Sequence, residues 1–136
     1  MAASSTIPAT LDALVTAARY VLAGTDTQVL DGGPTTQLDQ NFVAVGYSGV
    51  PGEPAVTAAR TRGGVTAGRD REVYDVACVA SSWLGEKPDA KAVRDRAFTD
   101  VDKIAAELAR DQTLTGVVVS ASLATTAVLQ EQTTKG

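Results

Sequence analysis

The spacing of hydrophobic side chains predicts one amphipathic helix near the start of the chain and a second in its latter half. In the first, apolar residues recur every three or four positions from Leu11 to Leu22, between Pro8 and Gly24, which predicts a helix over about 8–23. Pro88 and Asp89 mark the start of the second. Its apolar stripe comprises Val93, Ala97, Val101, Ile104, Ala105 and Leu108. Its opposite, solvent-facing side carries the four-apart charges Lys91, Asp95, Lys103 and Glu107.

Between these helices the pattern changes to short runs that are typical of strands. We expect extended segments at 28–30, 41–47 and 56–61, followed by a long strand over 72–84. Because both faces of that strand are largely apolar, we expect it to be central or covered twice, with Cys78 as a small core residue. Trp83 at its end either closes the core or anchors a partner. A further strand is expected over 117–123, with 127–129 as its extension.

This order of elements is a helix, a meander of three or four strands, a helix and a last strand. It predicts an α+β fold, a mainly antiparallel sheet flanked by two helices. The length of 136 residues suits a single domain over 1–136 with one hydrophobic core. Residues at about 125–136 form a polar C-terminal segment.

Composition removes most kinds of catalytic site. The chain has no histidine and one cysteine, which excludes Ser-His and Cys-His catalytic pairs, histidine metal sites, zinc clusters and an internal disulfide. The net charge of -4 disfavours nonspecific nucleic-acid binding except through a local basic patch. No apolar run is long enough to cross a membrane, and no secretory signal opens the chain. We therefore expect synthesis in a cytosol. A preference for Val over Ile and Arg over Lys indicates a GC-rich genome.

Two glycine patterns resemble functional motifs without meeting their requirements. The run from Gly46 to Val50 resembles a nucleophile elbow, but Val50 occupies the second glycine position and no histidine could activate Ser48. Gly46, Gly49 and Gly52 resemble a dinucleotide fingerprint, but the prolines that follow prevent the helix that such a motif needs. We therefore expect no catalytic residue, no cofactor site and no enzyme activity.

Acidic residues at the start of the long strand are an equally weak metal candidate. Asp70, Glu72 and Asp75 lack the arrangement of a calcium loop, and a solvated strand end is the better interpretation. We expect no metal site.

Two loops are candidate partner-binding segments. Arginines at 60, 62, 69 and 71 bracket one glycine-rich connection, so Arg62, Arg69 and Arg71 form the core of a local basic patch. An ordinary solubilising hairpin is the alternative interpretation of this patch. The loop over 48–54, which carries Ser48 and Glu53, is the second candidate.

Four segments carry a resemblance to a known family. They are VLDGGP at 29–34, FVAVGY at 42–47, DAKAVRDRA at 89–97 and LQEQT at 129–133. Together they resemble the tail terminator (tail completion) proteins of long-tailed actinobacterial phages, over nearly the whole chain. Relatives with this pattern usually continue into a further alternating strand, whereas this chain ends at Gly136, so a truncated chain or a sheet short of one strand is an open alternative.

The resemblance implies a structural protein of the virion, made in the host cytoplasm and placed at the head-tail junction. It implies a hexameric ring that caps the tail tube, stops polymerisation of the tube protein and presents a surface to the head-completion proteins. DNA would pass through the ring lumen without sequence-specific recognition. Two alternatives stay open: another head-tail connector ring component, and a small-molecule-binding α+β regulatory domain.

Overall fold

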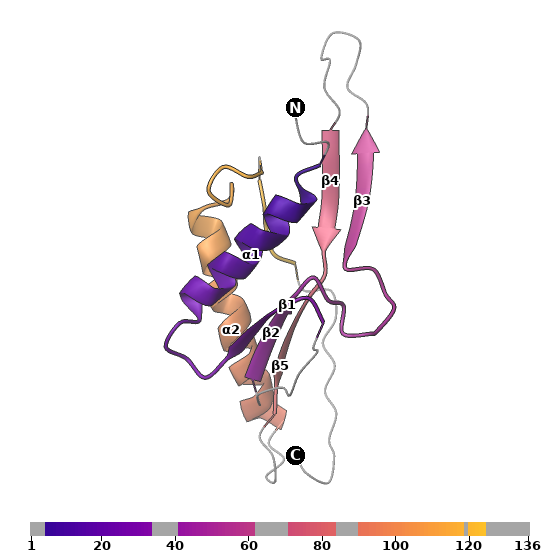
Figure 1. The fold of residues 1–136 in the computed structure, drawn as a ribbon. Helices are drawn as coiled ribbons and strands as arrows, with labels where there is room; N and C mark the ends of the chain where they lie inside the picture. Colours follow the sequence, from indigo (N-terminus) through magenta and orange to yellow (C-terminus); the bar gives the residue numbers. More distant parts are fainter. Residues whose placement is uncertain (1–4, 34–40, 62–70, 84–89, 119, 125–136) are drawn as a thin grey trace.

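The computed structural model describes residues 5–33, 41–61, 71–83, 90–118 and 120–124. Within them it contains two helices and five strands, which confirms the predicted α+β class (Figure 1). In chain order the elements are α1 (Ile7–Val21), β1 (Gln28–Asp31), β2 (Asn41–Val45), β3 (Val56–Thr61), β4 (Arg71–Val76), β5 (Cys78–Ser82) and α2 (Ala90–Arg110).

Helix α1 forms where the apolar periodicity predicts it. Pro8 stands in its first turn, where a missing N–H costs nothing, and Gly24 follows its end with a φ of +80°. Val15, Ala18 and Leu22 are buried. They belong to the predicted stripe, so the periodicity located both the helix and its inner face.

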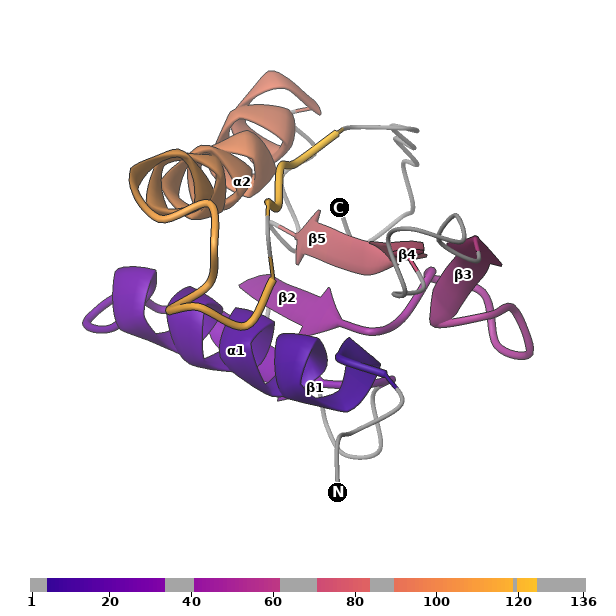
Figure 2. The same ribbon diagram turned by 90° about the horizontal axis from the view of Figure 1, so that it is seen from above.

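The body of the protein is a three-stranded sheet in the order β1-β2-β5. Strand β2 pairs parallel with β1 and antiparallel with β5, and Val43, Ala44 and Val45 in β2 are buried. Both helices lie on one side of this sheet, α1 beside β1 and β2, and α2 beside β5 (Figure 2). The prediction of an antiparallel meander is wrong for β1, which pairs parallel with β2. Alternation of apolar residues is the same for both directions of pairing, so it does not determine the direction of a strand.

Strands β3 and β4 form a separate antiparallel pair that projects from the body (Figure 1). We call this pair, residues 56–61 and 71–76, the arm. Strands β4 and β5 follow each other with only Ala77 between them, so the chain passes from the arm into the body at this residue. The Ala77 N–H donates to the carbonyl of Ala55 at 2.8 Å, and the Ala77 carbonyl accepts from Gly46 at 2.8 Å and Tyr47 at 3.0 Å.

The prediction of one continuous strand over 72–84 is therefore wrong, because the structure has two strands there, β4 and β5. Its first half pairs with β3 in the arm and its second half with β2 in the body. Cys78 is exposed, so its assignment to the core is also wrong, and Trp83 is 43% exposed and does not close the core. The alternating pattern predicted an extended chain, but it contained no signal for the change of partner at Ala77.

Helix α2 confirms the predicted stripe and leads into an unpredicted turn. Leu108 is buried and the other five stripe residues are half-buried. On the outer side, Lys91 Nζ lies 2.5 Å from Asp95 Oδ2 as its spacing predicts, whereas Glu107 pairs with Arg110 instead of Lys103.

The strand expected over 117–123 is absent from its described residues, which form turns and irregular chain. The Asp111 carboxylate accepts hydrogen bonds from Thr113 Oγ1 at 2.8 Å and from the Thr115 N–H at 2.9 Å. Leu114 and Thr115 have positive φ values of 49° and 60°, and Leu114 is buried. Because Leu114 enters the core here, the chain turns instead of starting a strand. The segments 127–129 and 125–136 lie outside the described residues.

Candidate interaction surface

The two faces of the arm have different surroundings. Residues directly opposite each other in the register share a face, and the pair Ala58 and Tyr74 lies on the face that meets α1. The other face carries the pairs Thr57 with Asp75 and Ala59 with Val73. We call these four residues the outer face of the arm.

The inner face is joined to the start of α1 by hydrogen bonds. The hydroxyl of Tyr74 lies 2.7 Å from Thr6 Oγ1 and 2.6 Å from Thr10 Oγ1. Glu72 Oε1 accepts from Ser5 Oγ at 3.0 Å and from the Thr6 N–H at 3.2 Å. A carboxylate at a helix N-terminus is favourable, because the unpaired N–H groups there make that end positive. These contacts set the direction in which the arm leaves the body.

The outer face makes no such hydrogen bond to any residue that the structure describes. Thr57, Ala59, Val73 and Asp75 are all exposed, and Val73 is exposed to 58%. Strands β3 and β4 pair only with each other within the described part of the chain. A two-stranded ribbon alone is marginally stable in water, and stable examples pack a face against something else. The outer face of the arm is therefore a strand face that no described residue covers.

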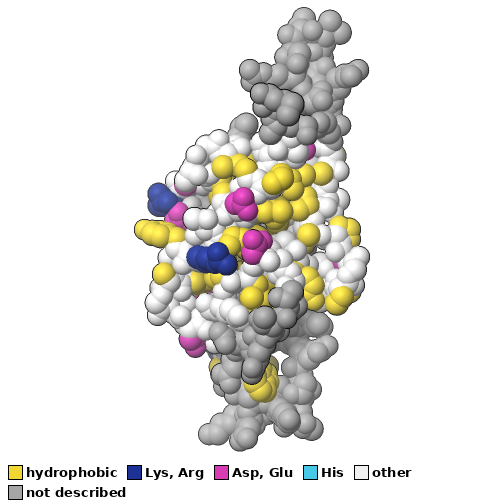
Figure 3. All heavy atoms as spheres, in the orientation of Figure 1, with side chains coloured by type: hydrophobic (Ala, Val, Ile, Leu, Met, Phe, Trp, Pro, Cys, Tyr) yellow, Lys and Arg dark blue, Asp and Glu magenta, His cyan; other side chains and the backbone are white. Residues whose placement is uncertain are grey.

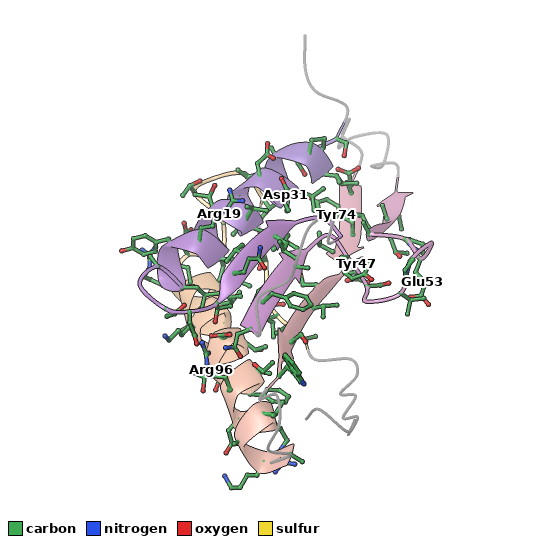
Figure 4. The ribbon with its side chains drawn as sticks, turned by 60° about the horizontal axis from the view of Figure 1, so that its bottom comes forward. Arg19, Asp31, Tyr47, Glu53, Tyr74 and Arg96 are labelled. Carbon is green, nitrogen blue, oxygen red and sulfur yellow. The ribbon has the colours of Figure 1, made fainter. Side chains whose placement is uncertain are left out.

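The 48–54 loop, the second sequence candidate, lies at the base of the arm. Ser48 Oγ donates to the Val50 carbonyl at 3.2 Å and accepts from the Val50 N–H at 3.2 Å. Its hydroxyl is thus committed to holding the turn. Glu53 is exposed and stands at the outer edge of the molecule (Figure 4). Gly49 and Gly52 have positive φ values, and the loop contains no helix.

The structure does not bring the sequence candidates together. Arg71 is the first residue of β4, and in the register it lies opposite Thr61 at the far end of β3. Ser48 and Glu53 precede the near end of β3, so the length of a six-residue strand, about 17 Å, separates the two regions. Arg62 and Arg69 lie outside the described residues. The two candidate loops therefore belong to opposite ends of the arm.

A buried polar cluster that the sequence did not predict lies between α2 and the 24–27 turn. Asp100 is 1% exposed, yet it lies in a helix whose other inward residues are apolar. Its Oδ2 accepts from Thr27 Oγ1 at 2.8 Å, and its Oδ1 accepts from Arg96 Nη1 at 2.6 Å. The one available signal was position: Asp100 follows Ala97 by three residues and precedes Ile104 by four, which places it within the apolar stripe.

Arg96 connects this buried carboxylate to the surface (Figure 4). Its Nη2 donates to Thr27 Oγ1 at 2.8 Å and also to Asp26, whose other oxygen accepts from Asn41 Nδ2 at 3.2 Å. The hydrogen bond from Arg96 holds the pKa of Asp26 below its usual range, and the hydrogen bonds to Asp100 and Asp26 raise the pKa of Arg96. Each oxygen of Asp100 has a partner, so the cluster serves to join α2, the turn and β2.

Within the described part of the chain, no cluster of acidic or cysteine side chains is arranged to hold a metal ion. Neither described helix is both long enough and apolar enough to cross a membrane. In comparisons with known proteins, no family model, no curated protein and no solved structure matched this chain.

Proposed function

We propose that the protein is a tail terminator of a long-tailed phage, which assembles as a hexameric ring on the finished tail tube. The observation that carries the proposal is the resemblance of four segments, spread over nearly the whole chain, to that family. The fold adds support, since a small α+β body is the fold that the resemblance implies. In this role the ring stops polymerisation of the tube protein and offers a surface to the head-completion proteins.

The exposed arm suits a protein that acts by assembly. Its outer face has no partner within the described chain, and a two-stranded ribbon gains stability when one of its faces is covered. The sequence 60–71, which runs from the end of β3 to the start of β4, contains four arginines and one aspartate. Arginine forms charge-assisted, often bidentate bonds to carboxylates, so Arg62, Arg69 and Arg71 are our candidates for contacts with acidic groups on the tube protein. Ser48 and Glu53 mark the alternative contact region.

Purified tube protein provides the test. Mixed with the chain under polymerising conditions, it should give tubes that stop growing, each with a ring at one end in electron micrographs. Native mass spectrometry should give six subunits per ring. Tubes of unlimited length in the presence of intact rings would contradict the terminator role. Rings that instead bind isolated head-completion proteins, and leave the tube unaffected, would assign the chain to a neighbouring connector.

A triple variant tests the arginine contacts. Changing Arg62, Arg69 and Arg71 together to Ala should leave the melting temperature nearly unchanged, because charges in a loop such as the sequence predicts here contribute little to stability. Capping should fall, and tails should run long. Glu53→Gln, which keeps the hydrogen bonds that Ser48 makes in the turn, is the control in the other loop. Tails of normal length from the triple variant, together with long tails from the control, would move the capping contact to 48–54.

A further inference from the structure

We propose that the arm is a hinged element, which is held against the start of α1 by side-chain hydrogen bonds and swings away about Ala77 when they are lost. We call the hydrogen bonds that Tyr74 and Glu72 make with residues 5–10 the latch. The inference goes beyond the proposed function and does not rest on it, because it concerns a single copy of the chain.

The latch is a shallow, polar contact. It joins two half-buried side chains of β4 to the first turn of α1 and the residues before it. Ala58, which lies opposite Tyr74 on the same face, is exposed, and apolar side chains remain at the surface on the side where α1 and the arm lie (Figure 3). A hydrogen bond adds little net stability, because water replaces it when it breaks. Among the arm residues whose side chains are described none is buried, so the latch and not an apolar core holds the arm against α1.

Ala77 has the position of a hinge. It is the single residue between β4 and β5. Its N–H donates to the Ala55 carbonyl and closes the base of the arm, while its carbonyl accepts from the N–H groups of Gly46 and Tyr47 in the body. A change in the backbone angles of Ala77 therefore redirects the arm without breaking either set of bonds. Hinges in proteins are commonly a few such residues at the ends of elements.

The other strand of the arm can follow this movement. Residues 46–55 connect β2 to β3 and contain no helix or strand. Gly49 and Gly52 within them have φ values of +94° and +90°, a region of backbone angles that glycine enters without steric cost. The connection is therefore long enough, and has enough backbone freedom, to let β3 move together with β4.

The arm keeps its own strand pairing when it moves. Its two strands are joined by six consecutive residue pairs, from Val56 opposite Val76 to Thr61 opposite Arg71. Because these pairs lie wholly within the arm, whereas the latch joins the arm to α1, loss of the latch breaks none of the cross-strand bonds. The latched and released arrangements form a two-state element, and a partner that contacts one of them better shifts the balance toward it.

A distance between the arm and α1 measures the movement. Nitroxide labels at Val73→Cys and Tyr20→Cys, in a Cys78→Ser background, stand at exposed sites outside the latch. Val73 precedes Ala77 by four residues, about 13 Å along an extended strand, so a swing of about 30° moves it by about 7 Å. With the latch intact, double electron-electron resonance should give one narrow distance between the labels.

Tyr74→Phe with Glu72→Ala removes the latch. This latch variant should add a second distance, shifted by about 5–10 Å from the first. Tyr47→Phe with Glu53→Ala makes the same two changes near the base of the arm and should keep the single distance, because neither side chain belongs to the latch. If circular dichroism shows that the latch variant does not fold, Thr6→Val repeats the test from the α1 side, since the Thr6 side chain makes no cap hydrogen bond.

Amide hydrogen exchange distinguishes a swinging arm from an unfolded one. In the latch variant, the cross-strand amides of β3 and β4 and the Ala77 N–H should stay protected, with exchange rates within about threefold of the unmodified chain. A second distance with this protection retained supports the hinge. A single, unchanged distance in a folded latch variant would overturn it, because the latch would not hold the arm. A second distance with cross-strand protection lost, or the same second distance in the control variant, would overturn it as well, because the arm would then unfold or move for another reason.

Discussion

Removal of the Asp100 carboxylate should destabilise the fold more than any surface change, because this group is the most buried charge in the described chain. It is 1% exposed and accepts from Thr27 Oγ1 at 2.8 Å and Arg96 Nη1 at 2.6 Å. Asp100→Ala removes both bonds and leaves a cavity in the wall of α2. It also leaves the Arg96 guanidinium, whose side chain is 28% exposed, with one hydrogen-bond partner fewer.

The expected loss follows from these contacts. Breaking one partner of a fully buried ion pair costs about 3–5 kcal/mol. Arg96 keeps its contacts with Asp26 and Thr27, and its side chain is 28% exposed, so water replaces part of what it loses. We therefore expect the lower end, about 3 kcal/mol, or a fall of about 10 °C in Tm for a domain of this size. Asp100→Asn keeps the volume and one acceptor oxygen, so about 1–2 kcal/mol is expected.

Urea denaturation followed by circular dichroism measures both variants. Asp102→Asn, an exposed position two residues along the same helix, is the control and should change the free energy of unfolding by less than about 0.5 kcal/mol. A double-mutant cycle with Thr27→Val should give a coupling above about 0.5 kcal/mol, because the two side chains are hydrogen-bonded. A loss of under about 1 kcal/mol for Asp100→Ala, or additive effects in the cycle, would refute the assigned role.

Two further predictions concern the arm and the turn. Tyr74→Phe, which removes the hydroxyl contacts with α1, should lower the free energy of unfolding by about 1 kcal/mol in urea, whereas Tyr20→Phe at an exposed site should not change it; equal effects would show that the Tyr74 hydroxyl does not hold the arm. Arg96 lowers the folded-state pKa of Asp26, so its ionised form adds stability above its ordinary pKa near 4, and this stability is lost as pH falls through the lower folded value. Asp26→Asn should therefore flatten the stability profile as the pH falls through and below the ordinary aspartate pKa, and an unchanged profile would contradict it.

The sequence was most informative where periodicity and burial coincide. The apolar stripes of both helices were correct, because a helix that covers a sheet must place its apolar residues at the same three- and four-residue spacing. Strand β3 was found with its exact bounds, 56–61, since glycine and proline end the run on both sides. These elements depend on local chemistry alone.

The errors concern choices that local sequence does not make. The direction of β1, the change of partner at Ala77 and the turn at Leu114 all depend on which distant segment pairs or packs there. Cys78 was misplaced for this reason, because the strand it belongs to changes partner one residue earlier. Of the candidate site residues, Ser48 and Glu53 proved to lie at the base of the arm and Arg71 at its far end. The two loops stand on either side of the predicted strand 56–61, so their positions in the sequence already implied this separation.

The separation of arm and body also separates stability from assembly in this protein. The buried side chains, from Val15 and Val43 to Leu108 and Asp100, all belong to the body. Strands β3 and β4 contain no buried residue among those whose side chains are described, and hydrogen bonds to the start of α1 hold them in place. Substitutions on the outer face should therefore change association without changing the core, whereas Asp100→Ala should change the core first. If substitutions on the outer face and Asp100→Ala each change both the free energy of unfolding and the association constant, the arm and the body act as one cooperative unit. The contact between subunits would then have to include elements of the body.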